Sequence, residues 1–575
     1  MIFIDKFIKK LKEKKFKYIL FFWSLISVQF VFGSNLQNNG HLFNDLSNLF
    51  VCVIKVVLLN IVLVIIHYCI LELIEKVKCK KSETKINKEP VKKSKKNKWF
   101  IYFLIIFACW IPTVLAFYPC NLGYDGGFQI GKYFFLNKIQ HHPILITKLY
   151  TSFYALGLKF FTPTFGMFLF SLFQMSFMAS VFSYTVKFIE EETHKEWLRN
   201  ISIIFYGLYP YNQLFSITTT KDVIFAGLML IFIVFLYKMI EKKFEISDYI
   251  FVIIIGILML LSRNNAVYTL IFSLPIIVLI LIKDKCKCLK IGIAFILIIF
   301  MYKNINNLLY KSFNNEQERD KTLYEDTDIK LEQARSDEGD MRLSIFAQAI
   351  GRVVRDKENY LTKEEKEKIS FYFKDYKKLK ENYKTNIADN SVNMVNSKNV
   401  NENKKEFFKF IIELGKKYPI IYVESFLDTT RGYWYVADVS FSRITSYNRP
   451  GAFELYDYGL AKKEYRVLHE SKLPGLKNFY INLYCLNIYQ QIPILYVVFQ
   501  PGIYFYITLA FLLFSVYKRD KNLMVIVILL FTFYASCFMA HCSIIRYMYP
   551  VMVSTPVMLA LFIKNRKMGG EEWNY

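Results

Sequence analysis

Long apolar blocks of roughly 15 to 25 residues alternate along this chain with short polar clusters, and a helix needs about 20 such residues to cross a membrane. Buried helices of soluble proteins do not recur so regularly. The pattern therefore predicts an α-helical polytopic membrane protein with about twelve transmembrane helices. The predicted spans cover residues 18–33, 49–71, 99–117, 164–188, 200–217, 222–240, 249–262, 265–282, 289–303, 499–517, 523–540 and 546–563.

The charged residues are segregated from these blocks. The chain has 74 Lys and Arg residues and a net charge of +26, although 54% of its residues are hydrophobic. The lysines cluster beside apolar blocks, where insertion asymmetry and anionic headgroups explain them, so nucleic acid is not an expected partner. Placing both termini in the cytoplasm puts the main basic clusters on that side of the cell membrane. These clusters lie at residues 6–17, 76–98, 242–243, 283–290, 518–519 and 564–567.

One long hydrophilic stretch interrupts the series of spans, at residues 304–480. It is long enough to pack a modest core. With both termini in the cytoplasm, the order of the predicted spans places it on the extracytoplasmic face. The external loop at 118–163 ends in an apolar stretch, 144–161, that contains two lysines, so we predict an interfacial amphipathic helix there. The chain then divides into N-terminal spans with a lysine-rich loop, a core, a soluble insert and C-terminal spans, at residues 1–98, 99–303, 304–480 and 481–575.

The cysteines predict neither a disulfide framework nor a metal site. Ten are scattered along the chain, several of them inside apolar blocks, where Cys acts as a small hydrophobe. The pair Cys286 and Cys288 stands alone on a short basic loop, without the second pair that a zinc site needs. We therefore predict no cofactor, and a divalent metal cannot be read from the pattern.

Polar residues at the extracytoplasmic ends of the spans are the candidates for chemistry. In the first external loop, Asp125 is followed by two glycines and by Gln129, which lies four residues further on. On a helix these two side chains face the same way. A carboxylate at the membrane boundary is suited to accept a proton from a hydroxyl. In the alternative interpretation Asp125 is an ordinary turn or cap residue, and the His141-His142-Pro143 run only starts the next helix.

Three further clusters carry charge at the same ends. Lys221 and Asp222 open one span, Arg263 lies in a tight turn, and Arg546 precedes Tyr547 near the last span. Cations at membrane depth need a partner, and a lipid phosphate is a natural one for arginine. The alternatives are that Asp222 caps its helix and that the arginines pair with acidic residues of neighbouring helices.

An aromatic run, Arg431-Gly432-Tyr433-Trp434-Tyr435, lies in the second half of the insert. Aromatic rings with one polar end suit the stacking of sugars. Such a run also occurs as core or as an interfacial anchor, and the sequence leaves these alternatives open.

Taken in order, the acidic first loop, the His-Pro pair, the Lys-Asp helix start and the late Arg-Tyr make the chain resemble the GT-C superfamily of polytopic glycosyltransferases. The similarity extends from Tyr118 to Pro550 and is strongest to a bacterial branch of large, Lys- and Asn-rich membrane proteins. Many members have paired acidic residues in the first loop, whereas a single Asp stands here. The two spans before residue 99 are also additional to the usual start.

The resemblance implies a GT-C-like fold and an inverting transfer of a sugar from a polyprenyl-phosphate donor to a glycan, lipid or protein acceptor. Asp125 corresponds to the catalytic base. Lys221, Arg263 and Arg546 fall where such enzymes hold the lipid-linked phosphate, with Gln129, His141, His142, Asp222 and Tyr547 as further substrate-binding candidates. A transporter or flippase of lipid-linked saccharides, and an envelope polysaccharide polymerase or ligase, remain as alternatives.

Overall fold

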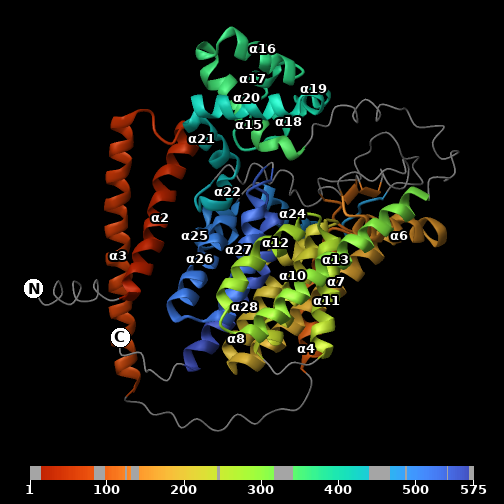
Figure 1. Ribbon diagram of the computed structural model, residues 1–575. Helices are drawn as coiled ribbons and strands as arrows, with labels where there is room; N and C mark the ends of the chain where they lie inside the picture. Colours follow the sequence, from red (N-terminus) through yellow and green to blue (C-terminus); the bar gives the residue numbers. More distant parts are fainter. Residues whose placement is uncertain are drawn as a thin grey trace, which may run out of the picture.

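The computed structural model describes most of the chain, and Figure 1 shows a helical bundle that carries a smaller helical layer at one end. Among the described residues the secondary structure consists of helices, and β-pairing is limited to isolated bridges. The chain is therefore an α-helical protein, as the apolar blocks predict. The described residues are 14–82, 98–123, 126–127, 129–130, 142–241, 246–315, 341–438, 467–485, 488–540 and 542–568.

Eight of the described helices are long and apolar enough to cross a membrane. They are α2 (Lys14–Asn39), α3 (Leu46–Ser82), α4 (Trp99–Ala116), α7 (Pro163–Thr193), α10 (Lys221–Glu241), α13 (Lys285–Asn315), α26 (Pro501–Lys518) and α28 (Ile545–Met568). Three shorter apolar helices join them, α11 (Ile246–Ser262), α12 (Ala266–Leu281) and α27 (Lys521–Cys537). These helices confirm the prediction of a membrane protein.

The region predicted as one span at 200–217 is instead two helices, α8 (Glu196–Leu208) and α9 (Pro210–Phe215). Tyr209 separates them with extended backbone, φ −65° and ψ 119°. The cause is Pro210, because a proline ring disfavours helical geometry in the residue before it but is well placed as the first residue of a new helix. The apolar stretch is continuous in sequence, whereas the helix is not.

Helix α6 (Ile144–Phe160) forms where the interfacial helix is predicted. It packs against α7 through Gly157 and Gly166, whose backbones meet so closely that a Cβ on either residue would lie 2.9 Å from the Cα of the other. Thr162 caps α7 by accepting a hydrogen bond from Phe165 N at 3.1 Å. The location of α6 at the membrane interface stays a prediction.

Helix α10 is the centre of the bundle. It contacts α7, α11, α27 and α28, and 89% of its apolar stretch is buried inside the protein. A helix that is hydrophobic all round is expected in such a central position. Its charged residues, which include Lys221 and Asp222, lie only at its two ends.

Residues 341–438 form the helical layer above the bundle, which we call the insert (Figure 1). Its own hydrophobic core includes Ile350, Ile369 and Phe407. Helix α13 continues to Asn315, beyond the predicted start of the hydrophilic stretch. The insert contains α15 (Ser344–Lys357), α16 (Lys363–Tyr372), α17 (Tyr376–Glu381), α18 (Asp389–Asn393), α19 (Ser397–Glu402), α20 (Lys404–Lys417), α21 (Pro419–Thr429) and α22 (Arg431–Trp434), with short 3-10 turns at Met341–Leu343 and Glu358–Tyr360.

A chain segment between the insert and α26 lies along the insert-side end of α4. It contains α24 (Pro474–Cys485), a 3-10 turn at Ile488–Gln491 and α25 (Pro493–Phe499). Glu470 N donates to Tyr118 O at 3.1 Å, and Lys472 N donates to Leu115 O at 2.9 Å. These bonds fix the segment to the end of α4 and to Tyr118 just beyond it.

A buried ionic network joins the insert to the turn between α2 and α3. The Arg352 guanidinium lies 3.0 Å from Asp428 Oδ2 and 3.2 Å from Glu424 Oε2, and all three side chains are at most 1% exposed. Arg352 also donates to the carbonyl of Gly40, and His41 Nδ1 lies 3.0 Å from Glu424. The N-terminal hairpin is therefore tied to the insert as well as to α26.

Candidate functional site

The site is built on the segment 217–220, which precedes α10. Asn121 pairs with it through two backbone bonds, from Asn121 N to Ile217 O (3.0 Å) and from Thr219 N to Asn121 O (2.9 Å). Gln174 of α7 donates to the carbonyls of Phe215, Ser216 and Thr218 at 2.9 to 3.0 Å. Asn121 and the segment that leads into α10 are thus held together.

Two glycines that follow Asn121 in the chain allow this close approach. A Cβ on Gly123 would lie 2.9 Å from Thr218 Cγ2, and a Cβ on Gly126 would collide with the hydroxyl and carbonyl of Thr219. Gly123 and Gly126 therefore lie against the residues that lead into α10. Asp125 and His141 are outside the described residues.

The charged candidates from three separate helix ends meet at Asp222. The Arg263 guanidinium donates to Asp222 Oδ1, and Arg546 Nε lies 3.5 Å from Asp222 Oδ2. Thr220 Oγ1 donates to the same carboxylate at 3.1 Å. The Asp222 side chain is 0% exposed, and the two arginines are 5% and 6% exposed. Desolvated ions of this kind need both charge partners and hydrogen bonds.

Aromatic rings surround the Arg263 guanidinium. Its central carbon lies 4.6 Å from the ring centre of Tyr547 and 5.6 Å from those of Phe225 and Phe533. Arg546 lies 5.2 Å from the same Tyr547 ring. Each contact is a favourable cation–π geometry, and together they hold the two cations in an otherwise apolar shell.

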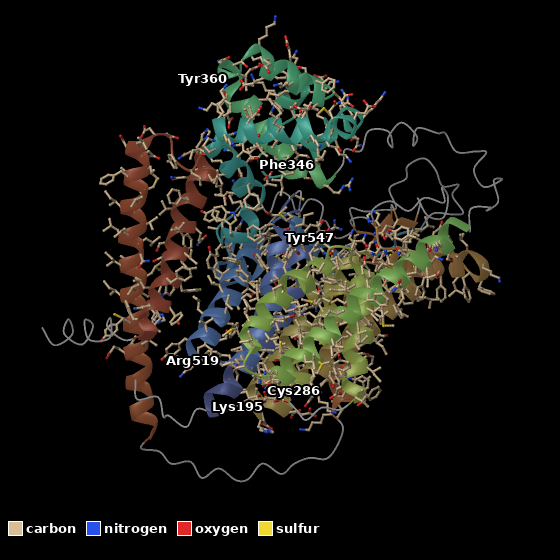
Figure 2. All side chains as sticks on the ribbon, in the orientation of Figure 1. Lys195, Cys286, Phe346, Tyr360, Arg519 and Tyr547 are labelled. Atoms are coloured by element: carbon tan, nitrogen blue, oxygen red, sulfur yellow. The ribbon has the colours of Figure 1, made fainter. Side chains whose placement is uncertain are left out.

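The cluster carries excess positive charge at the insert-side end of the bundle. Figure 2 shows Tyr547 at that end, whereas Lys195, Cys286 and Arg519 lie at the opposite end. Asp222 and Tyr547 are in the first turns of α10 and α28, and Arg263 lies just before α12, so three helix starts add their partial positive charges to the two arginines. One carboxylate opposes them. Such an arrangement favours a bound anion.

The other candidates lie beside α10 but form a separate contact. Lys221 Nζ is 3.4 Å from His142 Nδ1, and His142 is 6% exposed. Gln129 is buried and its Oε1 accepts a hydrogen bond from Thr147 at 3.0 Å. Lys221 is thus directed to the loop that precedes α6, whereas its neighbour Asp222 is directed to the arginines.

The aromatic run of the insert is part of the protein interior. Tyr433 is 0% exposed and Tyr435 is 5% exposed, and a Cβ on Gly33 of α2 would lie 2.5 Å from the Tyr435 ring. The core interpretation of the run therefore holds for these two rings.

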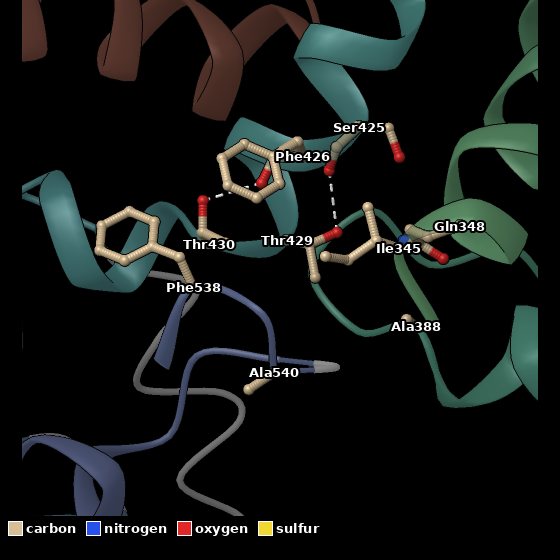
Figure 3. A pocket seen from close by; sticks show the side chains of 9 residues that line it. All are labelled: Ile345, Gln348, Ala388, Ser425, Phe426, Thr429, Thr430, Phe538 and Ala540. Carbon is tan, nitrogen blue, oxygen red and sulfur yellow. Dashed lines mark hydrogen bonds between the residues drawn. The ribbon is translucent and has the colours of Figure 1, made fainter. Parts of the chain in front are cut away.

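The pocket in Figure 3 lies between the insert and the end of α27, and it is only about 10 Å³. Ser425, Phe426 and Thr429 of α21 line it together with Phe538 of the bundle. This volume is that of about one water molecule, so the pocket is a packing defect and not a substrate site. Among the described residues, no three His, Cys, Asp or Glu side chains are grouped to hold a metal ion.

The sequence interpretation missed the ionic network of Arg352, Glu424 and Asp428. Its signal is the spacing of the two carboxylates, four residues apart in the otherwise apolar segment Pro419–Thr429. Acidic residues on one face of an apolar helix require a buried cationic partner.

The fold and this site define a polytopic helical membrane protein with a buried, positively charged cluster beneath an insert. The chain belongs to the protein family described as "Family of unknown function (DUF6020)", which matches residues 134–316 and 331–574, more than half of the chain. No curated protein and no solved structure matches it.

Proposed function

We propose that this protein is a membrane glycosyltransferase of the GT-C type. It transfers a sugar from a polyprenyl-phosphate donor to a cell-envelope glycan, lipid or protein acceptor at the membrane face that bears the insert. The observation that carries the proposal is the cluster of Arg263 and Arg546 around Asp222, buried at the insert-side end of the bundle. A lipid-linked phosphate is the anion that reaches such a position from the bilayer.

The chemistry requires a base and a cation site. Asp125 takes the proton from an acceptor hydroxyl, and the oxygen attacks the anomeric carbon of the donor sugar with inversion of configuration. The bond from that carbon to the phosphate oxygen breaks, and polyprenyl phosphate leaves with one additional negative charge. Fixed cations stabilise the charge as it develops, which is the role proposed for Arg263 and Arg546.

The distribution of charge supports a transferase over a transporter or flippase. A transport path through the bundle needs polar groups along its length. Helix α10, the central helix, carries Lys221 and Asp222 at one end, Lys238 and Glu241 at the other, and apolar residues between. The charged groups of α10 thus stand at its two ends and do not line a path between them.

The proposed location is the bacterial cytoplasmic membrane, with both termini in the cytoplasm. Support comes from the basic residues at the end opposite the insert, where Lys195 and Arg519 lie (Figure 2). Basic residues flanking spans favour the cytoplasmic side. The insert and the Asp222 cluster then face the envelope.

The proposal is tested by substituting Asp125→Asn and comparing envelope glycans by mass spectrometry. Cells with the variant are expected to lose the glycan product while the protein inserts and folds normally. Asp45→Asn is the matched control, because Asp45 is an exposed residue at the start of α3 that only caps its helix. Full product with Asp125→Asn would remove this residue as the base and would exclude the mechanism.

A further inference from the structure

The insert contacts residues 542–544, a short segment that leads into α28 and Arg546. Tyr433 of the insert clamps this segment at both ends. Its hydroxyl donates to Cys542 O at 3.1 Å and accepts a hydrogen bond from Ile544 N at 3.0 Å. Tyr433 is 0% exposed, so neither bond competes with water.

Two further contacts hold the same segment to the insert. Ser543 Oγ donates to Thr429 O at 3.0 Å, and Ile387 and Cys542 form an antiparallel β-bridge. All three residues of the segment therefore contact the insert. These contacts are to the segment and not to the side chains of Asp222, Arg263 or Arg546. Within the described chain, the insert fixes the backbone from which Arg546 and Tyr547 project.

Tyr433 is itself rigidly mounted. Its carbonyl accepts a hydrogen bond from Tyr534 of α27 at 2.5 Å, and its amide donates to Thr430 O at 2.9 Å. Two residues before Tyr433, Arg431 forms ion pairs with Asp428 and Asp438, and its Nε lies 3.0 Å from Asp438 Oδ1. These three side chains are at most 5% exposed. Hydrogen bonds thus tie Tyr433 to α27 as well as to residues 542–544.

We infer that Tyr433 is a positioning residue, which sets Arg546 for binding of the donor phosphate and couples the insert to that site. The inference rests on the proposed function and adds a regulatory role to the same site. The insert then has a coupling role, because a movement of α21 and α22 also moves the backbone at Arg546. A hydroxyl that bonds both a carbonyl and an amide within three residues fixes the start of a helix more tightly than packing alone.

The test is binding of farnesyl phosphate, with farnesol as the uncharged control, to the purified full-length protein in detergent. Tyr433→Phe keeps the ring and removes the hydroxyl, and it is expected to weaken farnesyl phosphate binding about tenfold. Farnesol binding is expected not to change. Tyr506→Phe is the matched control, because the Tyr506 hydroxyl donates to Trp434 O of the same short helix at 3.0 Å without touching residues 542–544.

Ser543→Ala supplies a second variant on the same segment, in case Tyr433→Phe does not fold. A double variant with Arg546→Gln separates positioning from general destabilisation. If Tyr433 acts through Arg546, the two effects on binding are not additive, whereas independent effects add.

The outcomes are distinguishable. If Arg546→Gln itself leaves farnesyl phosphate binding unchanged, the proposed donor site fails. If Arg546→Gln weakens binding but Tyr433→Phe and Ser543→Ala do not, only the positioning role is overturned. Equal loss in Tyr433→Phe and Tyr506→Phe would also overturn it, since it would show that any lost hydroxyl in this layer has the same effect.

Discussion

Arg263 donates a hydrogen bond to Asp222, and this pair joins the turn after α11 to the first turn of α10 in the centre of the bundle. Both side chains are buried, and Arg546 approaches the second carboxylate oxygen from α28. One carboxylate therefore connects α10 and the turn after the neighbouring helix α11 to α28, which is distant in sequence.

Asp222→Asn is expected to destabilise the protein by about 3 kcal/mol, because it leaves two buried guanidinium groups without their counter-charge. Thermal unfolding in detergent measures the change. Glu381→Gln, which removes an exposed pair with Lys377, serves as the control and is expected to leave the melting temperature unchanged. An equal effect of both substitutions would show that the Asp222 pair contributes no more than a surface pair.

Arg263→Lys keeps the charge but is expected to weaken farnesyl phosphate binding. Lysine lacks the planar guanidinium that lies over Tyr547 and donates along fixed directions. Titration of the variant against the native protein at two salt concentrations measures the loss. Unchanged affinity would mean that charge alone matters at this position.

Cysteine labelling tests the proposed orientation. Lys377 is 84% exposed on the insert, and the native Cys286 is exposed at the opposite end of the bundle. In intact cells a membrane-impermeant maleimide is expected to label Lys377→Cys but not Cys286, with peptide mass spectrometry as the measurement. Labelling of Cys286 without permeabilisation would reverse the assigned orientation.

Arg352→Met is expected to loosen the N-terminal hairpin from the insert, at a cost of about 3 kcal/mol, because Glu424 and Asp428 stay buried with fewer partners. Hydrogen exchange at the Leu42 amide, which donates to Glu424 at 2.8 Å, reports the opening. The control is Arg355→Met, since Arg355 is 27% exposed and pairs with the neighbouring Asp356. Slow exchange at Leu42 in both variants would contradict this role of Arg352.

His469 makes the segment along α4 sensitive to acid. Burial, and secondarily Lys477, lowers the pKa of His469 from 6.5 to about 4. An unfolded histidine gains its proton below about pH 6.5, whereas the folded one stays neutral to about pH 4. The contribution of neutral His469 to the free energy of unfolding is therefore fully present above pH 6.5. It falls by up to about 3 kcal/mol as the pH is lowered toward 4.

The measurement for His469 is exchange of the Glu470 and Lys472 amides, which are bonded to Tyr118 O and Leu115 O. Their exchange is expected to accelerate between pH 6.5 and 4, after correction for the intrinsic rate. The exchange rates of these amides are expected to depend less on pH in His469→Gln. If the variant and the native protein show the same pH dependence, groups other than His469 cause it.

The sequence predicts the helices well because the apolar period and length are local properties. It fails at 200–217, where most residues are apolar but Pro210 ends one helix and begins the next. A hydropathy value averaged over a window of residues is insensitive to the one backbone N–H that Pro210 lacks. The dipeptide Tyr209-Pro210 carries that information and should weigh more than hydropathy.

The charged candidates could be chosen from the sequence, but their arrangement could not. Lys221 and Asp222 are neighbours, yet one contacts His142 and the other contacts Arg263. Which of two adjacent side chains faces the centre depends on the rotation of α10, and a helix that is apolar all round gives no sign of it. The partners also come from α28, at the far end of the chain.

The pairing at Asp222 also sets an order of assembly. During synthesis Asp222 enters the membrane 41 residues ahead of Arg263, and Arg546 follows only with the final helix. A ribosome that stops before α28 releases a bundle in which Asp222 has only one of its two arginines.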